Sequence, residues 1–204
     1  MQKTPTAQRI VGLTLGAIVL GLLVVLAVVL PKAQGDTGSA DLPETLPVGW
    51  TAADALDPDD VPEAAGADAE ELVERQVDQR KYVEDTYAEV YDEAPAFRVY
   101  TDEELRQVAL VTVFETGPGS FAPPQGLVDP EVAGLERAPV ELVREGDALC
   151  AVSYQAVAAG EDSGEPQTIT CQQPSGSRTV QLTTQGVSVD DTFTLLDEIS
   201  TELA

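Results

Sequence analysis

The sequence predicts an α+β domain that follows a single membrane-spanning helix. Three observations lead to this prediction: an uncharged apolar run over residues 10–30, a helical repeat of apolar residues near each end of the remaining chain, and alternating strand patterns between them. We expect an antiparallel sheet of about five to six strands, packed by an N-terminal and a C-terminal helix.

The run 10–30 contains no charge, and its only polar side chain is Thr14. As a helix it rises roughly 30 Å, which is enough to cross the hydrocarbon core of a bilayer. It exceeds the ~7–15 apolar residues of a cleaved signal peptide, and Pro31 and Lys32 follow where small residues would lead to cleavage. We therefore predict an uncleaved signal anchor, with a secreted form as the alternative.

Positive charges indicate the orientation of this anchor. Lys3 and Arg9 precede it, and only Lys32 follows closely. The positive-inside bias predicts that residues 1–9 form a cytoplasmic tail and that everything after the span is extracytoplasmic. The protein is thus expected to be a single-pass protein of the cell membrane.

The composition narrows the classes of function. The chain has 36 acidic and 11 basic residues and a net charge of −25, a field that repels nucleic acid. It has no His and only two Cys, so a Ser-His-Asp triad, a Cys-His pair and the usual zinc sites are excluded. We expect no enzyme, no cofactor, no metal and no nucleic-acid partner, but a non-catalytic binding or envelope accessory module.

The alternative function uses carboxylates, as a carboxylate-based enzyme or a calcium site. Paired carboxylates perform acid–base chemistry and bind calcium. The candidates are two groups of acids: Asp54, Asp57, Asp59 and Asp60, and Glu161 with Asp162. The spacing of an EF-hand is absent from both groups.

Residues 31–66 are predicted to form an acidic, proline-rich tether. A segment with few apolar and many charged residues buries too little apolar surface to offset the conformational entropy lost on ordering. Within it we expect Leu46 and Trp50 to dock on the folded domain, since a large aromatic side chain is usually buried. A peptide that binds a partner is the alternative.

The folded domain is assigned to residues 67–204. The spacing of Val73, Val77, Val83, Tyr87 and Val90 predicts a helix over 68–94, which Pro95 ends.

Alternation then predicts the strands. They lie at 97–100, 108–114, 140–144, 148–157, 167–172 and 178–184, with an irregular segment at 117–126. A capping box of Ser188 and Asp191 begins the last helix, whose apolar stripe is Val189, Phe193, Leu196, Ile199 and Leu203.

Two strands carry the cysteines. Pairing Cys150 with Cys171 also sets Val152 opposite Ile169, so the register that joins the cysteines joins the apolar residues. A cross-strand disulfide is expected outside the membrane. A redox-active pair is the alternative, but the spacing C-x-x-C is missing.

The orientation can be tested with a cysteine added next to Ala204. We expect a membrane-impermeant maleimide to label it in intact cells, because the domain is predicted to be extracytoplasmic. Labelling that appears only after lysis would reverse the orientation.

Gly12 and Gly16 form a G-x-x-x-G pattern, which lets two spans approach closely. The hypothesis of a self-associating span predicts a weaker signal for Gly16→Ile in a membrane two-hybrid assay. An unchanged signal would contradict the hypothesis of a self-associating span.

Overall fold

The computed structural model describes residues 41–61, 68–117 and 127–203. The cytoplasmic tail 1–9 and the anchor 10–30, with Gly12 and Gly16, lie outside the described residues. In the ranges that are described, no helix is both long and apolar enough to cross a membrane. The chain divides into two units, 1–38 and 39–204, and the second is the one described below.

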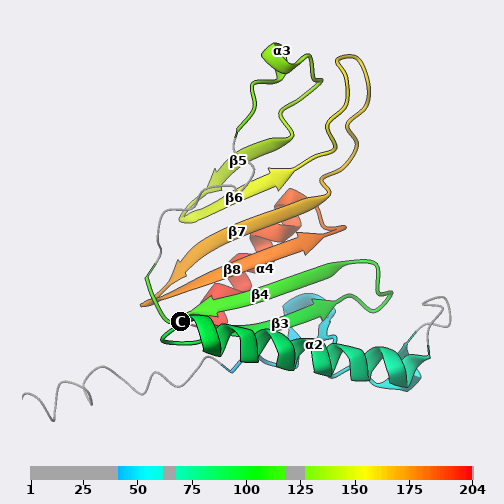
Figure 1. Ribbon diagram of the computed structural model, residues 1–204, viewed down its shortest axis with the longest axis vertical. Helices are drawn as coiled ribbons and strands as arrows, with labels where there is room; N and C mark the ends of the chain where they lie inside the picture. The colour runs from blue at the N-terminus through cyan, green and yellow to red at the C-terminus, as the bar shows by residue number, and fades with distance from the viewer. Residues whose placement is uncertain (1–40, 62–67, 118–126, 204) are drawn as a thin grey trace, which may run out of the picture. The chain divides into compact units, whose positions relative to one another are not determined.

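The second unit is an α+β domain with one antiparallel sheet, as the sequence predicts. Its strands lie in the order β1-β2-β3-β4-β8-β7-β6-β5 (Figure 1). The strands are β1 (Thr45–Leu46), β2 (Trp50–Ala52), β3 (Ala96–Thr101), β4 (Val108–Phe114), β5 (Val140–Glu145), β6 (Ala148–Ser153), β7 (Thr168–Ser175) and β8 (Arg178–Gln185). The helices are η1 (Pro47–Gly49), η2 (Pro58–Asp60), α2 (Ala69–Val90), α3 (Pro130–Ala133) and α4 (Val189–Glu202).

Strands β3 to β8 correspond to the six predicted strands, and the sheet is larger than expected because of β1 and β2. These two strands come from the segment that we assigned to the tether. Leu42, Leu46 and Trp50 are only 3%, 5% and 7% exposed, so the predicted docking of Leu46 and Trp50 is confirmed. The folded unit therefore includes residues 41–61 and begins earlier than residue 67, because this segment pairs with β3 and buries its apolar side chains.

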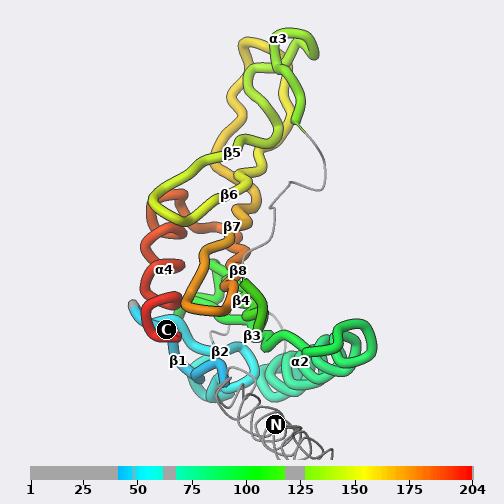
Figure 2. Tube along the Cα trace, turned by 90° about the vertical axis from the view of Figure 1, so that its left-hand side faces the viewer, coloured from blue at the N-terminus to red at the C-terminus, as the bar shows by residue number. Residues whose placement is uncertain are grey.

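The core lies between one face of the sheet and α4, which crosses behind β7 and β8 in Figure 1. Figure 2 shows the same helix from the side, on the opposite face of the sheet from α2. The α4 stripe of Phe193, Leu196 and Ile199 is buried, as predicted. Ser188 caps the helix by accepting the Asp191 N–H at 3.1 Å, and its hydroxyl donates to the Asp191 carboxylate.

Helix α2 lies against β3 and buries none of its residues fully. The predicted stripe is wrong at Val77 and Val90, which are exposed. Arg80 is instead half-buried, because its guanidinium pairs with a carboxylate beside β3. The helix ends at Val90, before Pro95, and residues 91–95 join it to β3.

The predicted disulfide is present between Cys150 and Cys171. The two residues are direct partners on β6 and β7, and Val152 is paired with Ile169. Both cysteines are fully buried beneath α4 in the core, so the bond joins strands that the apolar register already aligns.

Candidate functional site

The face of the sheet opposite α4 is the candidate site. Helix α2 covers it over β3, but no helix within the described ranges packs on it over β5 to β8 (Figure 1). Among the side chains that the register places on this side of the sheet, we call twelve the neutral face: Leu110, Thr112, Phe114, Leu142, Leu149, Ala151, Thr170, Gln172, Pro174, Thr179, Gln181 and Thr183. Thr112, Ala151 and Thr179 are buried, and the others are partly or fully exposed.

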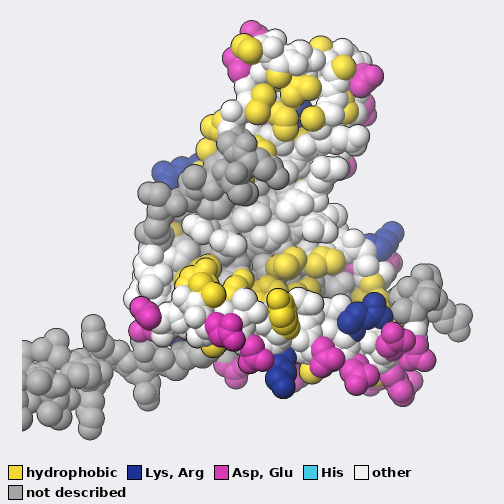
Figure 3. All heavy atoms as spheres, in the orientation of Figure 1, with side chains coloured by type: hydrophobic (Ala, Val, Ile, Leu, Met, Phe, Trp, Pro, Cys, Tyr) yellow, Lys and Arg dark blue, Asp and Glu magenta, His cyan; other side chains and the backbone are white. Residues whose placement is uncertain are grey.

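The neutral face contains no carboxylate. Strands β4, β6, β7 and β8 have no acidic residue, although the chain has 36. Glu141 and Glu145 of β5 alternate to the other side, where Glu141 is opposite Val152. Arg144, at the outer strand β5, is the one charged side chain that the register of β4 to β8 brings to its margin. Where it is not behind the atoms drawn in grey, this surface is mainly uncharged above α2 in Figure 3.

The middle of the neutral face is a ladder of carboxamides and hydroxyls. Gln172 Nε2 donates to Gln181 Oε1 at 3.0 Å, and the hydroxyls of Thr170 and Thr183 are 3.2 Å apart. All four side chains are partly exposed. In the described part of the chain, Gln172 Oε1 and Gln181 Nε2 have no further partner, so an acceptor and a donor remain available next to each other.

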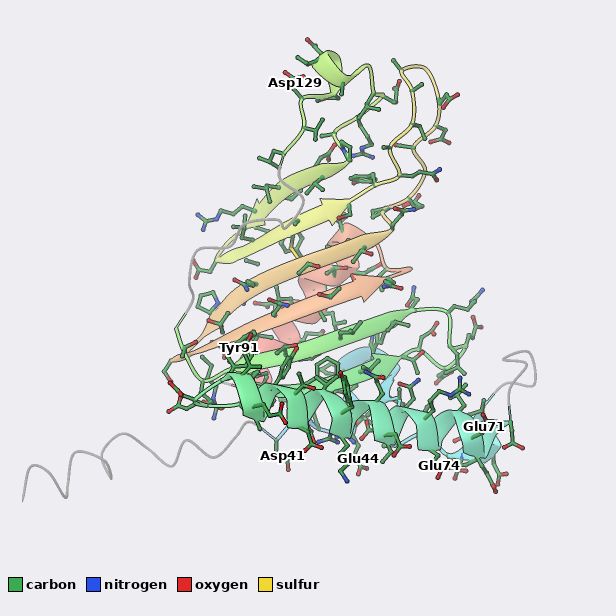
Figure 4. All side chains as sticks on the ribbon, viewed as in Figure 1. Asp41, Glu44, Glu71, Glu74, Tyr91 and Asp129 are labelled. Carbon is green, nitrogen blue, oxygen red and sulfur yellow. A yellow bond between two sulfur atoms is a disulfide. The ribbon has the colours of Figure 1, made fainter. Side chains whose placement is uncertain are left out.

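An aromatic cluster borders the face beside β4. Tyr87 contacts Phe97 edge-to-face with ring centroids 6.2 Å apart, and Tyr91 contacts Phe114 at 6.1 Å. Tyr91 is 44% exposed and lies where α2 ends near the sheet (Figure 4). At the opposite border Leu142 is 42% exposed. The polar ladder thus lies between two apolar margins.

A buried ion-pair network holds α2 and therefore this aromatic border. Asp54 accepts from Arg98 Nε at 2.9 Å and from Arg80 Nη1 at 2.8 Å. Arg98 also donates to the Leu42 carbonyl at 2.7 Å. Burial raises the pKa of Asp54, but the hydrogen bonds and charges of Arg98 and Arg80 outweigh it, so this pKa lies below its ordinary value.

The predicted acidic groups do not come together. Asp54 is bound to the two arginines, whereas Asp57 caps η2 by accepting the Asp59 N–H at 3.0 Å. Glu161 accepts the N–H of Ala158 and Asp162 that of Gly164, each within its own loop. Across the ranges that the structure describes, no group of three His, Cys, Asp or Glu residues could hold a metal ion.

Another acidic surface was not singled out from the sequence. A pocket of about 560 Å³ lies between the β5–β6 turn and α4, lined in part by Glu145, Asp147, Asp197 and Glu198. Glu198 Oε2 is buried without a hydrogen-bond partner among the described residues. This pocket is on the α4 side of the sheet and is separate from the neutral face.

The sequence analysis also missed Gln172, Gln181 and the paired threonines of the neutral face. Their one signal was the lack of acids in strands of so acidic a chain. Comparison with protein-family models, with curated proteins and with solved structures finds no match, so the site rests on its own geometry.

The Asp54 network predicts a pH-dependent contribution to stability. Asp54→Asn should lower the free energy of unfolding by about 2–3 kcal/mol at neutral pH, because it leaves Arg98 buried without a counter-charge. The folded-state pKa of Asp54 is lowered, so its contribution is complete above the unfolded value of about 4 and is lost as the pH falls through the folded value.

Urea unfolding of both proteins between pH 7 and about pH 2.5 would measure this difference, which should shrink below about pH 4. The control is Glu84→Gln, since Glu84 pairs with Arg80 at the surface and should contribute less than about 0.5 kcal/mol. Equal effects of the two variants would contradict the role given to Asp54.

Proposed function

We propose that this chain is a non-catalytic binding module of the cell envelope, held at the membrane by residues 10–30, and that it binds through the neutral face. The observation that supports this is the lack of carboxylates on a partly exposed sheet face of a chain with net charge −25. A face that served only for solubility would be expected to carry its share of these charges.

The chemistry of the face favours recognition without reaction. Its groups are hydroxyls, carboxamides and apolar side chains, which donate, accept and pack but do not exchange protons near neutral pH. Four of the six carboxylates that the alternative function would use are already bound: Asp54 to arginines, and Asp57, Glu161 and Asp162 to nearby backbone N–H groups. The binding module is thus better supported than the carboxylate-based enzyme or calcium site.

The scaffold around the face is suited to binding. The sheet beneath it is backed by α4 and joined across β6 and β7 by the disulfide, and the Asp54 network attaches α2 at its border. Groups held on rigid strands lose little entropy when a partner binds. The predicted membrane anchor would place this surface outside the cell, within reach of envelope components.

Photo-crosslinking tests the proposal. A diazirine amino acid at position 183, in the middle of the face, should give a specific adduct in the intact native membrane, detected as a gel shift and by mass spectrometry. The matched control is position 201, an exposed threonine on α4. Equal adducts at both positions, or none at position 183, would contradict binding on the neutral face.

A further inference from the structure

We infer that the partner of the neutral face is an uncharged glycan chain. This rests on the proposed function, because it names the class of partner for the same surface. The inference follows from the hydrogen-bonding and aromatic groups of the face, and from the classes of partner that its charge and its paired backbone disfavour.

The ladder offers mixed donors and acceptors in one plane. Gln172 Oε1 accepts, Gln181 Nε2 donates, and the hydroxyls of Thr170 and Thr183 can do either. Sugar hydroxyls also donate and accept at the same atom, so successive hydroxyls of a glycan can pair along such a ladder. A partner with only donors or only acceptors would leave half of these groups unpaired, at a cost for each.

Charge disfavours the ionic classes of partner. Within the described strands, the neutral face has no carboxylate for a cationic ligand and only Arg144, at its margin, for an anionic one. The net charge of −25 repels anionic polysaccharides and nucleic acid at longer range. A cationic partner would be drawn instead to acidic surfaces, such as the pocket lined by Asp197 and Glu198. An uncharged ligand is neither repelled by the net charge nor drawn to the acidic surfaces elsewhere.

Backbone hydrogen bonding disfavours an extended peptide. Strands β6, β7 and β8 each have a strand on both sides, so their backbone groups are already paired. A peptide that binds by strand addition needs a free edge and would pair with the outer edge of β5, at the margin of this surface. A purely apolar partner would desolvate Gln172 and Gln181 without replacing their hydrogen bonds.

The aromatic border of the neutral face also favours a glycan partner. The Tyr91 ring is partly exposed and is held by edge-to-face contacts with Tyr87 at 5.6 Å and Phe114 at 6.1 Å. A rigid exposed ring packs against the apolar C–H face of a sugar at low entropic cost. From β4 to β5 the face spans five strands, or about 19 Å, which suits a chain of several sugars rather than one.

The test is a titration of the full chain, purified in a detergent without a sugar head group. The probes are cellohexaose, maltohexaose, mannohexaose and chitohexaose, with oligogalacturonate as the anionic comparison. We expect saturable binding of at least one neutral probe and no binding of oligogalacturonate. No binding of any neutral probe, or equal binding of the anionic one, would overturn the inference.

Two neighbouring glutamines supply the matched variants. Gln172→Leu removes the ladder acceptor and should weaken binding by about tenfold. Gln173→Leu should leave binding unchanged, because Gln173 faces the other side and contacts Asp197. Tyr91→Ala, a second variant that does not touch the ladder, should also weaken binding, with melting temperatures confirming that each variant is folded. Equal affinities of both Gln variants would overturn the inference.

The two proposals fail in different ways. If no neutral probe binds and the diazirine at position 183 captures a protein, the inference of a glycan partner is wrong, but the proposal that the neutral face binds a partner is supported. If position 183 captures nothing and no probe binds, both are wrong.

Discussion

The buried pair of Arg98 and Asp54 is the constraint on which the arrangement around the sheet depends. A guanidinium that is almost completely buried on β3 requires a counter-charge, and Asp54 provides it from the chain that follows β2. The same carboxylate binds Arg80 of α2, and Arg98 also binds the Leu42 carbonyl. One network thus joins the N-terminal segment, the sheet and the helix, because each charge would be costly to bury alone.

This network explains why the two faces of the sheet differ. On one face α4 and the N-terminal segment bury a continuous apolar core. On the other, α2 is attached through Arg80 near β3 and does not extend over β5 to β8. Besides Arg80, α2 contacts the sheet through the Tyr87–Phe97 ring pair and buries none of its residues fully, so it covers little of the sheet. Within the described ranges no helix packs on the surface over β5 to β8, next to which the carboxamide ladder and the aromatic border lie.

Sequence reasoning worked where the signal was local and periodic. The six strands β3 to β8, the final helix with its Ser188 cap and the disulfide were predicted from alternation, spacing and register. It worked less well for α2, where Val77 and Val90 were placed on a buried stripe but are exposed. Periodicity identifies an apolar face but not whether another element covers it. The two short strands β1 and β2 were missed because the surrounding prolines and acids resemble a tether.

The sequence alone determined the class of fold, the order of its main elements, the disulfide register and the absence of histidine-based chemistry, because these depend on composition and on neighbours along the chain. The tertiary structure alone decided which carboxylates are used structurally, as with Asp54, and which side chains form the neutral face. Gln172 and Gln181 come from different strands, and only the pairing of β7 with β8 brings their carboxamides into contact. The two residues are nine positions apart in the β7–β8 hairpin, and their contact depends on the register of that hairpin and on which face of the sheet α4 packs against, neither of which their spacing fixes.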